Sequence, residues 1–438
     1  MEDREAVLFE PIEETGRGFY RALAILVPIL AVAMLALGRQ LVLGLKVTGL
    51  NRPVYWGMYI TNFVFFIGIS HAGTLVSAIL RVFGAEWRRP ITRMAEAITV
   101  FALILGTGSI MIDMGRPDRL LNILRYARFE SPLVWDVTSV TIYLTASLTY
   151  LFLPLIPDLA ILRDRPGLSA WRHWLYAKLS LGWTGTQKQK HRLERLISIM
   201  AVLIIPIAVS VHTVVSWVFA MTVQPMWHST IFGPYFVIGA IFSGIATLII
   251  VMALVRRAYR LHAYITPMHF SNLGLLLLIF SFLWAYFTFS EYLTEFYGNE
   301  PAGMRVLFAK LTEEFSPIFW AMWVFNFIVP FIVLSNRRTR TIAGTVIVSI
   351  LVNVGMWLER FSIVVPTLTR PRLPTPDASY APTWVEWSIL VGSIAVFALL
   401  YILFSKVFPI ISIWEVREGE EIAARQASPT HTAEAAAD

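Results

Sequence analysis

The chain has 438 residues, of which 57% are hydrophobic and 15% are charged, and its mean hydropathy is +0.65. Soluble domains carry roughly 25% charged residues, so this composition excludes a water-covered globular protein and favours one whose solvent is lipid. The absence of Cys excludes disulfides, thiolate metal sites and cysteine-ligated iron–sulfur clusters within the chain. The net charge of +7 is typical of a membrane protein with basic cytoplasmic loops, so we do not expect nucleic acid as a partner.

Ten segments are long and apolar enough to cross a bilayer, for which about 20 residues are needed. In chain order they lie near residues 19–45, 54–83, 91–113, 132–157, 195–221, 231–256, 269–292, 317–336, 341–363 and 383–407. We therefore predict an all-α polytopic membrane protein of about ten transmembrane helices, arranged as two four-helix bundles plus two additional helices.

The remaining segments divide the chain around a transmembrane domain of residues 19–407. Residues 1–18 have no cleavable signal pattern and are expected to form a cytoplasmic arm, residues 163–195 form a basic connection, and residues 408–438 are expected to be a disordered cytoplasmic tail. With ten spans, about two-thirds of the 36 Lys and Arg residues fall on the side shared by both termini. This bias places both termini in the cytoplasm. We expect the protein to lie in the cytoplasmic (cell inner) membrane.

Titratable residues inside the spans are costly in hydrocarbon, so each is a functional candidate. His71 lies mid-span among small residues, His212 lies in the fifth span and Glu96 begins the third. Glu291 and Glu295 are four residues apart and share one helix face. A structural histidine and a proton-transfer or quinone-site histidine are both open interpretations of His71. A haem held by two histidines needs paired ligands at matching depth, and only His71 and His212 lie well inside spans. We therefore expect no internal haem.

Acidic residues mark the outer ends of the third and fourth spans. Asp113 ends the third, and Arg116 follows it before Pro117, which disfavours further helix. Asp136 follows the helix-start signal Ser131-Pro, where a carboxylate would interact favourably with the helix dipole. A short loop joins the two spans, so both carboxylates are expected at similar depth. Asp113 is either the partner of Arg116 in an interfacial ion pair or a proton acceptor beside a bound headgroup. Asp136 is either a helix cap or a second proton acceptor.

Several short motifs, taken together, resemble the NrfD/PsrC family of quinone-reactive membrane subunits in polysulphide-reductase-like complexes. They are Pro53-Val-Tyr-Trp-Gly57, Ser70-His-Ala-Gly-Thr74, Gly115-Arg-Pro117 and Ser131-Pro-Leu-Val-Trp-Asp136. Further segments are similar to the ten-span members in alternative complex III, namely Leu155-Ile-Pro-Asp-Leu-Ala-Ile-Leu-Arg-Asp164, Leu181-Gly-Trp183, Ser210-Val-His-Thr-Val-Val-Ser216, Trp227-His-Ser-Thr-Ile-Phe232 and Pro234-Tyr-Phe236. The resemblance covers residues 50 to 300.

This resemblance implies a subunit of a quinol:electron-acceptor oxidoreductase complex. A quinol (menaquinol or ubiquinol) would be oxidised near the outer face, and electrons would pass to an iron–sulfur subunit there. Other membrane and cytochrome subunits would complete the complex. In this family a His and an Asp placed like Asp113 and Asp136 line the quinol pocket, so the resemblance implies that these two are the catalytic residues. From their positions and chemistry in this sequence, we expect the quinone to be bound by Arg116, Trp135, Tyr126 and His71. Asp113 departs from the closest members, which have His before the Gly-Arg pair.

Coupled proton translocation is a further expectation, through His71, His212, Glu96, Glu291 and Glu295. No haem, iron–sulfur cluster or metal is expected on this chain alone. Two alternatives stay open. A secondary transporter would show paired broken helices near the midplane of both halves, and a structural or proton-conducting sister subunit would lack quinol activity.

Overall fold

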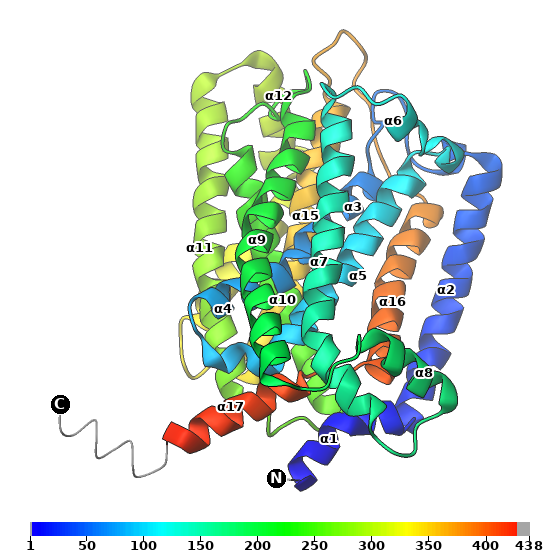
Figure 1. Cartoon of the computed structure of the whole chain (residues 1–438). Helices are drawn as coiled ribbons and strands as arrows, with labels where there is room; N and C mark the ends of the chain where they lie inside the picture. The colour runs from blue at the N-terminus through cyan, green and yellow to red at the C-terminus, as the bar shows by residue number, and fades with distance from the viewer. Residues whose placement is uncertain (1, 427–438) are drawn as a thin grey trace.

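The computed structural model describes residues 2–426, and every regular element in this part of the chain is a helix (Figure 1). The α-helices are α1 (Glu2–Glu13), α2 (Arg17–Leu43), α3 (Met58–Ile69), α4 (Leu80–Val82), α5 (Arg89–Asp113), α6 (Asn122–Arg125), α7 (Pro132–Arg163), α8 (Ala170–Leu179), α9 (Gln187–Ala220), α10 (Phe232–Ala258), α11 (Pro267–Gly298), α12 (Pro301–Leu311), α13 (Ser316–Trp323), α14 (Val329–Leu334), α15 (Ile342–Thr369), α16 (Trp384–Val407) and α17 (Ile413–Gln426). Two π-helical segments, η2 (Ala72–Ile79) and η5 (Val324–Ile328), and the short 3-10 turns η1 (Leu45–Val47), η3 (Glu86–Arg88) and η4 (Pro117–Arg119) complete the elements.

Nine helical stretches of the described chain are long and apolar enough to span a membrane. They correspond to nine of the ten predicted segments. The remaining prediction, residues 54–83, is divided among α3, η2 and α4, because the helix changes from α to π hydrogen bonding just after His71. The polytopic all-α fold is therefore confirmed, and its second crossing is a composite helix.

Helix packing follows the predicted division into two bundles. The α3–η2, α5, α7 and α9 helices form one bundle, and α10, α11, α13–η5–α14 and α15 form the other. Helix α10 joins them, because it also packs against α3 and α9. Helices α2 and α16 pair with each other at the edge (Figure 1).

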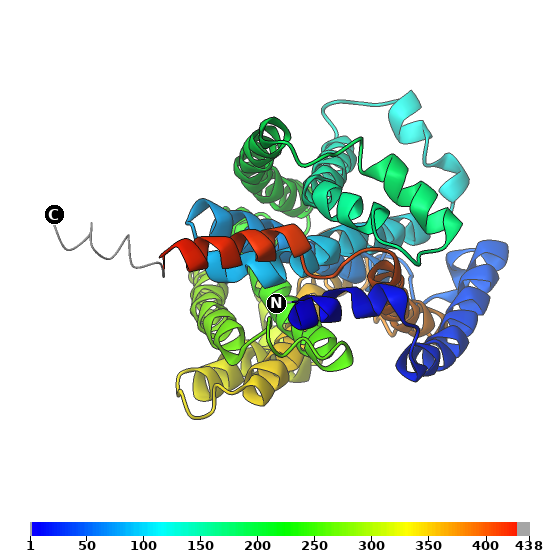
Figure 2. The same cartoon turned by 60° about the horizontal axis from the view of Figure 1, so that its bottom comes forward.

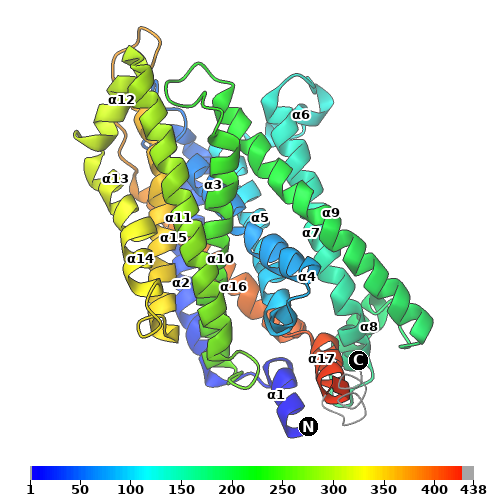
Figure 3. The same cartoon turned by 90° about the vertical axis from the view of Figure 1, so that its left-hand side faces the viewer.

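Helices α1, α8 and α17 all lie at one end of the bundle, and α6 and α12 lie at the other (Figures 1 and 3). Figure 2 shows α1 and α17 lying across the helix ends at their face. We call this the terminal face and the opposite end the outer face. The described part of the chain therefore begins, with α1, and ends, with α17, at the same face, as an even number of crossings requires.

The chain after residue 408 differs from the expected disordered tail, since Ile413–Gln426 forms helix α17. Asp158 accepts hydrogen bonds from the backbone N–H groups of Ile413 and Trp414, at 3.1 and 2.9 Å. Glu415 pairs with Arg81 at 3.1 Å. These contacts to buried partners order a segment whose composition alone indicates disorder, while residues 427–438 lie outside the described part. The N-terminal arm is likewise helical, because α1 buries Leu8, Phe9 and Ile12.

Candidate functional site

Two carboxylates occupy the outer ends of α5 and α7, which pack against each other. Asp113 is the last residue of α5, and Asp136 lies in the second turn of α7 with 5% of its surface exposed. The Oδ1 atom of each is buried and accepts no hydrogen bond. Asp136 does not cap its helix, so its oxygen is available for a proton or a ligand donor.

Arg116 and Tyr126 lie exposed in the loop between α5 and α7, and Trp135 lies in the first turn of α7, whereas the fourth predicted quinone-site residue, His71, is buried in the bundle interior. Arg116 does not pair with Asp113; its guanidinium makes two hydrogen bonds of 2.9 Å to Asp118, and both side chains are exposed. Asp118 pairs with the guanidinium because both side chains are exposed, whereas the Oδ1 atom of Asp113 is buried. Tyr126 is 68% exposed, and the Trp135 indole N–H donates to the carbonyl of Phe129. The structure thus places Arg116, Tyr126 and Trp135 at the outer face but leaves Arg116 and Tyr126 exposed.

A buried polar network that sequence analysis did not identify lies beside Asp113. Glu386 of α16 accepts hydrogen bonds from the Tyr380 hydroxyl at 2.5 Å and from the Gly49 N–H at 2.7 Å. The Tyr59 hydroxyl donates to Gln40 at 2.5 Å. Glu386 and Tyr59 are both electrostatic neighbours of Asp113. The only local signal was the Thr383–Glu386 capping box that begins α16.

In the bundle interior, His71 and His212 lie against each other. Both are fully buried, and their ring centroids are 4.2 Å apart. The two ring nitrogens of His71 lie 2.9 Å from the carbonyl oxygen of Ala208 and 3.2 Å from that of Ile67. A neutral imidazole carries one N–H and can donate to only one of these acceptors. The ring nitrogens of His212 make no hydrogen bond within the described residues.

The π-helical segment η2 begins immediately after His71. The Ser70 carbonyl that precedes it accepts hydrogen bonds from the Thr99 hydroxyl at 2.6 Å and the Tyr143 hydroxyl at 3.0 Å. A Cβ atom on Gly73 would collide with the carbonyl oxygen of Ala95, so only glycine allows α5 to approach here. Short π-helical segments occur frequently at functional sites, and this one fixes the position of His71.

Glu96 lies toward the terminal face in the same bundle. Its Oε1 atom accepts a hydrogen bond of 2.9 Å from the Ser77 hydroxyl, which also lies 3.3 Å from the Tyr150 hydroxyl. The Oε2 atom of Glu96 is buried without a partner. Like the two histidines, Glu96 faces the interior and not the lipid, as its cost in hydrocarbon requires.

A second group of buried charges lies in the other bundle, between the histidines and the outer face. Glu359 and Arg360 of α15 are each 1% exposed and pair at 3.0 Å. The Trp284 indole N–H donates to Glu359 at 3.3 Å, and the Arg360 guanidinium lies 4.8 Å from the centre of the Phe236 ring. Sequence analysis assigned no role to this pair, although a charge inside a predicted span was the signal that could have identified it.

Lys310 of α12 completes this group at the outer face. It is 4% exposed, and Glu291 and Glu295 are its electrostatic neighbours. Burial lowers the pKa of Lys310, and these carboxylates oppose that shift. Glu291 is 4% exposed with a buried Oε2 atom that has no partner, while Glu295 is partly exposed. The structure therefore joins the predicted glutamate pair to a lysine from the next helix.

Comparison with known proteins supports a membrane-subunit assignment. Residues 46–371 match the family model described as "Polysulphide reductase, NrfD". A putative membrane subunit of dimethyl sulfoxide reductase from Halobacterium salinarum is 29% identical over 411 residues, which cover 88% of this chain and 89% of that protein. A selenate reductase subunit from Mesobacillus selenatarsenatis is 24% identical, with 88% and 92% covered. The Hdr-like menaquinol oxidoreductase integral membrane subunit of Archaeoglobus fulgidus is also 24% identical, with 94% and 99% covered.

Proposed function

This chain belongs to the NrfD family of polysulphide reductase membrane subunits, and from that premise we propose that it is a quinol-oxidising subunit of a membrane oxidoreductase complex. The name of the archaeal menaquinol oxidoreductase subunit supports a quinol as the substrate. The names of all three relatives describe subunits, which supports assembly with partner proteins.

The observation that carries this proposal is the Asp136 carboxylate, which is buried at the outer end of α7 and has one oxygen without a partner. Quinol oxidation releases two protons and two electrons, so the site needs a base within hydrogen-bond reach of the quinol hydroxyl. We assign that role to Asp136. Asp113 is the second acceptor, and Glu386 and Tyr59 offer its proton a route into the neighbouring polar network.

The electrons leave the chain for a partner. A sequence without Cys cannot ligate an iron–sulfur cluster through thiolates, and we propose an iron–sulfur subunit on the outer face as the acceptor. In this assignment the exposed loop with Arg116 and Tyr126 lies where a quinone headgroup or the partner can reach it.

Proton movement through the bundle is the second part of the proposal. Helix directions give the depth of each group, since α5 and α15 both run from the terminal face to the outer face. On this basis Glu96 lies near the terminal face, the two histidines near the middle, and the Glu359–Arg360 pair closer to the outer face. Glu291 and Lys310 follow at the outer end. We propose that these side chains, with intervening water, carry protons across the membrane.

The decisive experiment compares quinol oxidation by purified complexes that contain Asp136→Asn or Asp164→Asn. Asp136→Asn keeps the shape of the side chain but removes the base, and loss of a general base typically costs on the order of 10²–10⁴ in rate. We expect at least a roughly tenfold slower turnover in a complex that still assembles. Asp164→Asn is the matched control, because Asp164 is an exposed aspartate that pairs with Arg163 at the terminal face, away from the proposed quinol site. Quinol turnover at the wild-type rate by Asp136→Asn would refute the assignment of Asp136 as the base.

One observation bears on the transporter alternative. Each bundle contains a π-helical interruption, η2 in the first and η5 in the second. Transporter sites are formed where paired helices unwind and expose backbone groups to a substrate. Here the backbone stays helical through both segments, which favours the redox subunit. Substrate uptake by the isolated chain in liposomes, without partner subunits, would reverse this preference.

A further inference from the structure

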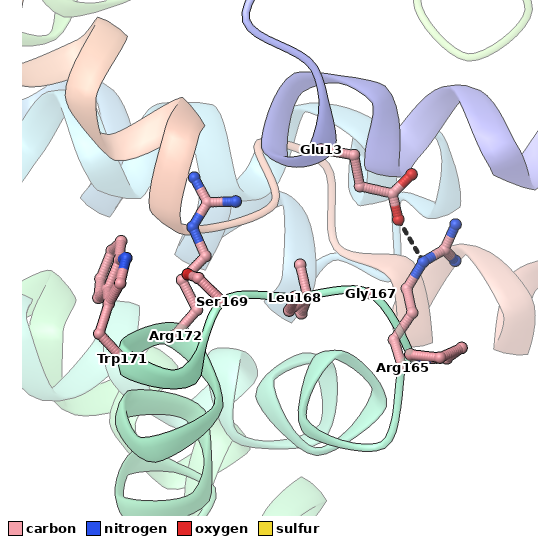
Figure 4. A pocket seen from close by; sticks show the side chains of 8 residues that line it. Glu13, Arg165, Gly167, Leu168, Ser169, Trp171 and Arg172 are labelled. Atoms are coloured by element: carbon pink, nitrogen blue, oxygen red, sulfur yellow. Dashed lines mark hydrogen bonds and ion pairs between the residues drawn. The ribbon is translucent and has the colours of Figure 1, made fainter.

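A cavity of about 760 Å³ opens at the terminal face between α1 and the segment that leads into α8. Glu13, Arg165, Leu168, Ser169, Trp171 and Arg172 contribute to its wall. Figure 4 shows the two arginine side chains extending toward α1 on opposite sides of Leu168. The cavity is far from the carboxylates of the outer face and plays no part in the proposed quinol chemistry.

The position of this cavity is fixed at the level where membrane spans end. The Tyr176 hydroxyl of α8 donates to the carbonyl of Val407, the last residue of α16, at 2.8 Å. Lys406 donates to the carbonyls of Pro11 and Glu14, at 2.7 Å each, and so fixes α1 to the same helix end. Because a span ends at the border between hydrocarbon and headgroups, the cavity lies at headgroup depth.

The charges in the cavity leave a positive excess. Arg165 pairs with Glu13 and its guanidinium lies 3.8 Å from the centre of the Phe9 ring, which holds it in place. Arg172 donates to the carbonyl of Ile12 at 2.7 Å. A guanidinium has five N–H donors, and the structure gives one hydrogen bond for each arginine. Two cations and one carboxylate therefore face the cavity, with N–H donors to spare.

Aromatic residues at its edge match a lipid interface. Trp171 and Trp174 of α8 are 54% and 64% exposed. Tryptophan is enriched at the headgroup level of membranes, and basic pockets beside transmembrane helices bind anionic headgroups. From the cavity, its charge and its depth we infer that the site between α1 and α8 binds the phosphodiester headgroup of an anionic phospholipid through Arg165 and Arg172.

Native mass spectrometry of the full-length chain in a zwitterionic detergent tests this inference, with dimyristoyl phosphatidylglycerol and dimyristoyl phosphatidylcholine as probes. We expect the wild type to retain phosphatidylglycerol preferentially. Arg165→Gln combined with Arg172→Gln should weaken that binding roughly tenfold to thirtyfold, since each basic residue near an anionic headgroup contributes about 1 kcal/mol. The matched control is Arg337→Gln with Arg338→Gln, two exposed arginines at the same face outside the cavity. This control should bind like the wild type.

Three further outcomes decide the inference. If the double variant has a lowered thermal unfolding midpoint, Arg172→Gln alone replaces it and should weaken the binding roughly fivefold. Arg172→Lys keeps the charge and should keep most of the binding. Inorganic phosphate at millimolar concentration should not displace the lipid; if it does, the site binds free anions and the inference is wrong. Equal retention of the two lipids by the wild type, or equal loss in the control variant, would also overturn it.

Discussion

The imidazole rings of His71 and His212 meet edge to face inside the first bundle, with a centroid separation of 4.2 Å and an interplanar angle of 75°. Two imidazolium ions this close would repel each other, and Arg360 adds a third positive charge nearby. The pair is therefore suited to carry at most one proton in addition to the N–H proton of each neutral ring, as a transfer step would require.

This relationship predicts the effect of His71→Ala in complexes reconstituted into liposomes. Proton translocation per electron should fall on the order of tenfold, because a group that transfers protons is lost, while electron flow should fall less. His262→Ala, at an exposed histidine of the terminal face, is the control and should change neither quantity. Equal losses of proton and electron flow would assign His71 a structural role.

Lys310 predicts a pH-dependent contribution to stability. Burial lowers its pKa below the ordinary value of about 10.4, so the folded state releases this proton at a lower pH than the unfolded chain does. The folded protein therefore gains stability from this group as pH rises from the lowered pKa toward that of the unfolded chain. Below that window the charged lysine opposes folding.

Lys310→Met should therefore have a higher thermal unfolding midpoint than the wild type. The difference in midpoint should be largest at neutral pH and should shrink as pH approaches 10. Glu291 and Glu295 are electrostatic neighbours of the lysine and are present in both proteins. Lys188→Met, at an exposed lysine, should show no such trend. A difference in midpoint that grows with pH would contradict the conclusion that burial of the charged Lys310 opposes folding.

Asp158 and Arg93 predict a large loss of stability when one partner is removed. They form a buried ion pair, and Asp158 also holds the start of α17. Breaking a buried pair costs about 3–5 kcal/mol, so Asp158→Ala should lower the unfolding midpoint strongly and expose α17 to protease. Asp164→Ala removes an exposed partner of Arg163 and should have little effect. Equal midpoints for the two variants would refute the structural role of Asp158.

The topology predicts opposite labelling of two single-cysteine variants, which is practical because the chain has no native Cys. Glu300, the site of one substitution, lies at the outer face before α12, and Lys188, the site of the other, lies at the terminal face. A membrane-impermeant maleimide added to intact cells should label Glu300→Cys and leave Lys188→Cys unlabelled until lysis. The reverse pattern would place both termini outside.

The sequence by itself determined the class of fold, because lipid imposes the same requirement on every residue of a span. Hydropathy located the membrane crossings, including the composite one around His71, and the cost of burying charge indicated that His71, His212 and Glu96 face the interior. The short loop between α5 and α7 also predicted that Asp113 and Asp136 lie at the same end. These conclusions depend on local composition and spacing alone.

Only the tertiary structure decided which charges meet. Glu386 bonds to Gly49, and Glu415 pairs with Arg81, across more than 330 residues of sequence in each case. Arg116 was expected beside Asp113 but pairs with Asp118, and α17 is ordered by partners on other helices. The Glu415–Arg81 pair is set by the packing of helices that are distant in the chain, whereas a span is set by its own residues. The composition of a segment therefore predicts that it is buried, but not its partner.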